Sequence, residues 1–264
     1  MNLNDWLNDG LMALPWWLPP LLALGLGLMA LAPLGEQVLR RGVVFIDLAV
    51  AQAAAAAALW WIWWQDHPGA WSVRGAALAG ALVAVVWVQN LARRHPAHRE
   101  ALIGLVYVLG AGLAVLGASQ DPHGREHLSE LLAADVLWAD WPQVGLMAAL
   151  AALGHAWQRL TGRWQRANLW GDWAFYLWFA VVASLAVGVL GLWLVFAGLI
   201  VPAWLALQGW GRVRRGTAVM LACAAGLAVS SLMDWPSGAC VIVSLAALGL
   251  AVSWIRSSAN KQAH

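Results

Sequence analysis

The sequence predicts an all-α, polytopic membrane protein with about nine transmembrane helices. Three observations predict it: an apolar composition, a series of long apolar runs, and an uneven distribution of basic residues. Of the 264 residues, 62% are hydrophobic and only 11% are charged, and the mean hydropathy is +0.69. Soluble domains contain about 25% charged residues. A soluble protein of this composition would have too little polar surface to cover its core.

The apolar runs define the expected helices in order, since a helix that crosses the hydrocarbon core needs roughly 20 apolar residues. Nine runs lie near 13–33, 42–64, 72–92, 101–118, 138–158, 173–190, 191–208, 216–233 and 237–255. The sixth and seventh meet around Gly188 and Gly191 with almost no polar linker. An eight-span count, with one of these two re-entrant or broken, is therefore the alternative. Residues 1–264 are expected to form a single transmembrane domain.

The basic residues test the span count independently. When the chain starts outside and alternates through nine spans, all but two of the 15 Lys and Arg residues fall in inner loops, and only Arg74 and Arg125 fall outside. Cytoplasmic loops carry an excess of Lys and Arg, and an eight-span count would put a basic cluster on the wrong side. The N-terminus is therefore expected outside and the C-terminus in the cytoplasm.

Tryptophan is unusually frequent, with 21 residues against 2 tyrosines. Many of them lie at or near the ends of the predicted spans, among them Trp16, Trp17, Trp60, Trp61, Trp63, Trp64, Trp71, Trp138, Trp141, Trp157, Trp173, Trp210, Trp235 and Trp254. Tryptophan is enriched where the membrane meets water. The sequence therefore predicts an interfacial belt rather than a cage of aromatic side chains around a ligand.

Two polar residues in the second run are the leading candidates for function, because ionisable groups inside a span are costly and mark function by default. Asp47 follows Arg41 by six residues, and Gln52 lies about five residues deeper. Asp47 and Ala51 share a helical face, while Gln52 lies about 100° further round. The alternative for Asp47 is a carboxylate that snorkels to, or pairs with, the nearby arginines.

The predicted outer loop DPHGREHLSE offers a weaker candidate. It contains His123 and His127 beside Asp121, Glu126 and Glu130, and imidazole and carboxylate groups are good zinc ligands. A solvated loop without a ligand is the alternative, because Pro122 and Gly124 disfavour a helix that would bring the two histidines onto one face. The chain has no GxxxxGK[ST] phosphate loop, so any ATP-driven work requires nucleotide binding by another chain.

Five stretches resemble a known family when taken in order. They are PLGEQVLRRGVVFIDLAVAQ (33–52), EALIGLVYVLGAGLAVL (100–116), LLAADVLWA (131–139, with Asp135), GLWLVFAGLIVPAWLAL (191–207, with Pro202) and SSLMDWPSGACVIV (230–243, with Asp234, Pro236 and Gly238). Together they are similar to the permease subunit of bacterial ABC importers for zinc, manganese and iron. The first is similar to that family's segment of Gly, two Arg, an Asp six residues on and a His four after that.

The resemblance implies a homodimeric permease in the bacterial inner membrane, cytoplasmic ATPase subunits, and an external metal-binding protein that delivers the ion. It places the transit site on the second span, where the family's Asp matches Asp47. The family's His position falls on Ala51, with Gln52 next along, which removes the expected nitrogen ligand. The ATPase is expected to dock near 159–173. The cargo would be zinc or manganese, with no cofactor bound by this chain and no nucleic-acid partner.

The sequence leaves other classes of function open. A permease of the same kind for a siderophore or a cobalamin-like compound is the main alternative, favoured by the missing histidine and the many aromatic residues. A membrane-embedded enzyme is disfavoured because neither HExxH nor GxSxG occurs. An accessory membrane subunit is a further alternative.

Overall fold

The structure is a computed structural model that describes residues 15–65, 68–120, 124, 126, 128–129, 136–161 and 169–262. In these residues it contains nine α-helices, two short 3-10 helices and no β-strand. The elements in order are α2 (Leu18–Arg41), α3 (Ile46–Trp64), α4 (Ala70–Arg94), η1 (Pro96–His98), α5 (Arg99–Ala118), η2 (Val136–Trp138), α7 (Trp141–Thr161), α8 (Leu169–Leu190), α9 (Leu192–Leu207), α10 (Arg212–Met233) and α11 (Ser237–Gln262).

The nine described helices confirm the all-α fold and coincide with the nine predicted apolar runs. By length and composition, seven of them are able to cross a membrane. The sixth and seventh runs form two separate helices, because Gly191 breaks the chain between α8 and α9 at φ 77°, a conformation that glycine adopts readily. The 16-residue α9 is about 24 Å long, at 1.5 Å per residue.

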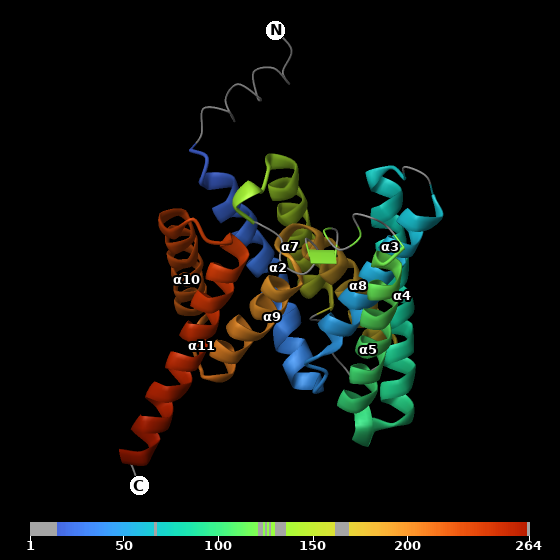
Figure 1. Ribbon diagram of the computed structural model, residues 1–264. Helices are drawn as coiled ribbons and strands as arrows, with labels where there is room; N and C mark the ends of the chain where they lie inside the picture. Colours follow the sequence, from blue (N-terminus) through green and yellow to red (C-terminus); the bar gives the residue numbers. More distant parts are fainter. Residues whose placement is uncertain are drawn as a thin grey trace.

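The helices form three groups that lie side by side (Figure 1). Helices α3, α4 and α5 form a bundle on one side, and α10 and α11 form a hairpin on the other. Between them, α2 packs against α7 and α9, and α8 packs against α4 and α3. Helix α3 therefore contacts α4, α5, α8 and α9, and its buried residues are spread around its circumference.

Small residues allow this close packing around α3, as they do in other membrane bundles. A Cβ atom at Gly80 of α4 would lie 2.5 Å from the Ala53 carbonyl oxygen and 2.6 Å from the Ala57 Cβ. On the α5 side, a Cβ atom at Gly110 would lie 3.1 Å from the Gln52 Cβ. The backbones of α4 and α5 therefore come close to α3 at two levels along its axis. These two contacts fix how the three helices are aligned lengthwise.

The two ends of the molecule differ in composition. Arginines collect at one end of the molecule, which we call the basic end. They lie in the last turns of α2 and α4 and in the first turns of α5 and α10: Arg40, Arg41, Arg93, Arg94, Arg99, Arg212, Arg214 and Arg215. Most of the exposed tryptophans lie at the other end, the tryptophan end, including Trp16, Trp17, Trp63, Trp64, Trp71, Trp138 and Trp235, whereas Trp87, Trp204 and Trp254 are exposed nearer the basic end. In Figure 1, α2 begins at the top of the view and α11 ends at the bottom, as an odd number of alternating helices requires.

Candidate functional site

Asp47 lies in the first turn of α3 and is 1% exposed. No side chain among the described residues bonds to its carboxylate oxygens, and the nearest donors are the backbone N–H groups of Asp47 itself and of Leu48. Buried polar groups in proteins are nearly always hydrogen-bonded, and those that are not require an explanation. A buried carboxylate without a side-chain partner is the arrangement expected where a cation passes.

The surroundings of Asp47 argue against the snorkelling alternative. The side chain does not reach solvent, and the guanidinium of Arg41 lies over the ring of Phe175 on α8, 4.4 Å from its centroid. The short connection before α3 is held in place from both sides. Gly42 ends α2 in the left-handed conformation (φ 63°), and the backbone N–H of Val44 donates a 3.1 Å hydrogen bond to Oε1 of Glu100. The connection between α2 and α3 therefore holds Asp47 at a fixed position in the protein interior.

Gln52, the second predicted transit residue, is also buried, at 6% exposure. Five residues along a helix correspond to about 140° of rotation and about 7.5 Å of rise, so Gln52 faces a different neighbour from Asp47. Its Cβ packs beside Gly110 of α5. The structure therefore places the two predicted residues on one helix without bringing their side chains together.

Gln89 of α4 is a candidate that sequence reasoning missed. It is 1% exposed, and neither its amide nitrogen nor its amide oxygen has a hydrogen-bond partner among the described residues. The sequence carries one indication of it, the two adjacent amides Gln89 and Asn90 near the end of the apolar run VVWVQNLARR, with Gln89 four residues before Arg93. From the sequence alone, Gln89 resembles a residue at the membrane surface, because it lies close to the arginines that end the run.

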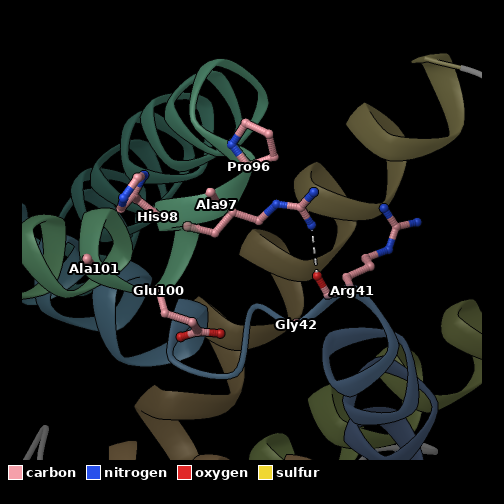
Figure 2. Close-up of a pocket in the computed structure, with 8 residues that line it drawn as sticks. Arg41, Gly42, Pro96, Ala97, His98, Glu100 and Ala101 are labelled. Carbon is pink, nitrogen blue, oxygen red and sulfur yellow. Dashed lines mark hydrogen bonds between the residues drawn. The ribbon is translucent and has the colours of Figure 1, made fainter.

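A cavity of about 510 Å³ opens at the basic end, between the α2–α3 connection and η1. Its lining residues are Arg41, Gly42, Pro96, Ala97, His98, Arg99, Glu100 and Ala101. Nη1 of Arg99 donates a 3.1 Å hydrogen bond to the Arg41 carbonyl oxygen, which Figure 2 marks with a dashed line. Oε2 of Glu100 and Nε of Arg99 are buried without a partner in the described part of the chain. The cavity therefore lies at the end of α3 where Asp47 lies, with the charged residues Arg41, Arg99 and Glu100 in its lining.

The other predicted sites cannot be placed. His123, His127 and Asp135 lie outside the described residues, and so does the middle of the expected ATPase-docking segment 159–173, at 162–168. Among the side chains that the structure does describe, no three from His, Cys, Asp and Glu gather to hold a metal ion. A single buried carboxylate, not a closed ligand cage, is thus what the described residues offer to a cation.

The late Asp-x-Pro-x-Gly stretch forms the turn between α10 and α11. Asp234 caps α10 in the left-handed conformation, at φ 54°. The hydroxyl of Ser230 donates to the Trp235 carbonyl oxygen at 2.6 Å, and the Ser237 hydroxyl accepts from the Leu137 N–H at 3.1 Å. The segment therefore has a structural role at the tryptophan end, far along the chain from Asp47.

Comparisons with known proteins agree with this architecture. Residues 172–256, from α8 to α11, match the ABC 3 transport family. The whole fold is similar to that of the solved structure described as PsaBC from Streptococcus pneumoniae in complex with Fab, with a TM-score of 0.70 and 15% identity over 95% of each chain. No curated protein matches the chain. The chain is thus a multi-pass helical membrane protein whose fold is similar to that of the PsaBC structure.

Proposed function

We propose that this chain is the membrane-spanning permease subunit of an ATP-binding-cassette transporter that imports divalent metal ions, zinc or manganese. The match of residues 172–256 and the similarity of the whole fold support a permease of the ABC 3 transport family. The observation that carries the proposal is Asp47, a carboxylate buried inside a candidate span with no side chain bonded to its oxygens. Intramembrane ionisable groups mark ion pathways.

In this proposal, the ion moves through the protein along α3. Asp47 supplies oxygen ligands for a short time, and few ligands are an advantage because the ion must also leave. An external binding protein delivers the metal at the tryptophan end. ATPase subunits bind at the basic end, near 159–173, and two copies of the permease form the pathway. ATP binding then changes the relative positions of the helices.

The test compares two isosteric Asp→Asn variants in a strain without its own copy of the transporter. Asp47→Asn removes the buried carboxylate, and we expect uptake of radioactive Mn²⁺ or Zn²⁺ to fall at least ten-fold. Asp140→Asn is the control, because Asp140 is exposed and its Oδ1 only accepts from the Gln143 N–H, a capping role that Asn also performs. Both variants should reach the membrane in wild-type amounts. Normal uptake by Asp47→Asn would disprove the assignment.

A second candidate cargo is an organic compound such as a siderophore or a cobalamin-like cofactor. The specific observation that favours it is Ala51, which offers no nitrogen ligand one turn beyond Asp47. The same deletion strain separates the two cargoes. Rescue of growth by added metal salts supports metal import, whereas rescue only by the chelated or vitamin compound supports the organic cargo.

A further inference from the structure

The first turns of α8 carry aromatic side chains that receive arginines from two other helices. The guanidinium of Arg41, at the end of α2, lies 4.4 Å from the centroid of the Phe175 ring and 5.9 Å from that of the Tyr176 ring. The guanidinium of Arg93, in the last turn of α4, lies 5.5 Å from the centroid of the Trp173 ring. Planar guanidinium groups stack favourably on aromatic rings. One end of α8 therefore contacts the basic ends of both α2 and α4.

The ring that receives Arg41 is held firmly inside the protein. Phe175 is 3% exposed, and its ring centroid lies 5.4 Å from that of Tyr176 and 5.9 Å from that of Phe179. Phe179 is 0% exposed and belongs to the main hydrophobic core. Close-packed interiors have low compressibility and transmit a displacement instead of absorbing it. The Phe175 ring therefore moves together with the helix that carries it.

Arg41 is also the last residue before the connection that leads to Asp47. Its carbonyl oxygen accepts the hydrogen bond from Nη1 of Arg99 (Figure 2), and the Val44 N–H within the connection donates to Glu100. The first turn of α5 therefore supports the connection through two hydrogen bonds, and α8 supports it through the Arg41 side chain. Because Asp47 follows Val44 by three residues, a displacement of either support changes the position of the carboxylate.

We propose that Arg41 and Phe175 are positioning residues that link movement of α8 to the position of Asp47 and so couple ATP hydrolysis to ion transport. The inference rests on the proposed function. The segment expected to bind the ATPase, 159–173, ends two residues before Phe175, and α8 is one continuous helix from Leu169. Rigid helices and packed side chains carry coupling between sites. A shift of the first turn of α8 therefore reaches Phe175, then Arg41, and then the connection before Asp47.

The experiment measures the number of Mn²⁺ or Zn²⁺ ions transported per ATP hydrolysed, with the permease and its ATPase subunit purified together in proteoliposomes. Phe175→Leu removes the ring that Arg41 contacts, and we expect this ratio to fall about five-fold, within the range by which mutations in such networks change coupling. Phe175→Tyr keeps the ring and should keep the wild-type ratio. Trp210→Leu is the matched control and should also keep it, because Trp210 receives Arg214 at 4.0 Å, a contact between residues only four apart in the chain.

The ratio of ions to ATP separates coupling from a structural role, because loss of folded protein lowers uptake and ATP hydrolysis together. An unchanged ratio in Phe175→Leu, or an equal fall in Trp210→Leu, would overturn the inference and leave the proposed function standing. If Phe175→Leu does not assemble, Arg41→Lys replaces it, since lysine keeps the charge but lacks the planar guanidinium. The same five-fold fall is expected there, and a wild-type ratio would overturn the inference. A wild-type transporter that hydrolyses ATP without taking up either ion would defeat the proposed function as well.

Discussion

At the residue scale, two of the buried carboxylates, Asp47 and Glu100, lie near the basic end. Helices α3 and α5 run parallel, with Gly110 opposite Gln52 and Gly117 opposite Leu59. This register places Glu100 level with residue 42 or 43, about 7 Å nearer the basic end than Asp47. Glu100 lines the cavity, and its Oε2 is buried without a partner in the described chain. A cation that leaves Asp47 toward the basic end would therefore meet this carboxylate next.

Glu100 also has a mechanical role that is separately testable. Its Oε1 accepts the Val44 N–H and so fastens the connection that precedes Asp47. Glu100→Ala leaves this N–H unpaired, and we expect a loss of about 1–3 kcal/mol of stability, seen as a lower Tm in detergent. Glu100→Gln retains an acceptor oxygen and should keep the wild-type Tm while still slowing ion release. Equal Tm values for Glu100→Ala and wild type would show that the bond does not hold the loop.

At the scale of elements, the tightest crossing lies between α2 and α9. A Cβ atom at Gly35 of α2 would lie 1.9 Å from the Leu199 carbonyl oxygen of α9. Pro202 lies inside α9 and lacks the N–H that would bond to Gly198, and Gly198 itself packs against the Leu28 and Leu31 side chains of α2. Backbone therefore meets backbone at this crossing, where no flexible side chain is able to yield.

We accordingly expect Gly35→Ala to be strongly destabilising. Overpacking of a core costs about 1–3 kcal/mol, and here the methyl group meets a carbonyl oxygen, so a loss at or above the upper value is expected. Gly75→Ala on α4 is the matched control, because a Cβ atom there meets nothing within 4 Å; alanine at an open helical site should raise stability slightly. Thermal unfolding in detergent measures both. A Gly35→Ala protein as stable as Gly75→Ala would contradict the α2–α9 contact.

At the scale of the whole molecule, the span pattern was predictable and the site was predictable only in part. Hydropathy identifies spans because a membrane helix must be apolar over its full length, and Gly191 marked the break that separates α8 from α9. Asp47 stood out because charge is rare inside spans. Gln89 did not, because its burial depends on how α4 packs against its neighbours, which one sequence does not contain. Gln52 stood out as a second polar residue in the same span, on a different face from Asp47, and its part in transit stays a prediction.

The difference in composition between the basic end and the tryptophan end predicts how the molecule is oriented in the membrane, and this prediction is testable. Arginines collect at the basic end, where Arg215 pairs with Glu36 and Arg99 bonds to the Arg41 carbonyl oxygen. At the tryptophan end, the described arginine is Arg74, which lies over the Trp71 ring at 5.0 Å. Because positive residues are retained on the cytoplasmic side, the basic end should face the cytoplasm and the tryptophan end the outside.

Single cysteines and a membrane-impermeant maleimide test this orientation directly. The native Cys223 and Cys240 are buried, so background labelling should be low even without replacing them. Gln65→Cys is exposed at the tryptophan end, and Ala97→Cys is exposed in η1 at the basic end. In intact spheroplasts we expect Gln65→Cys to be labelled and Ala97→Cys to be labelled only after the membrane is opened. The reverse labelling pattern would show that the basic end faces the outside. The Glu100 cavity would then lie where the ion enters instead of where it leaves.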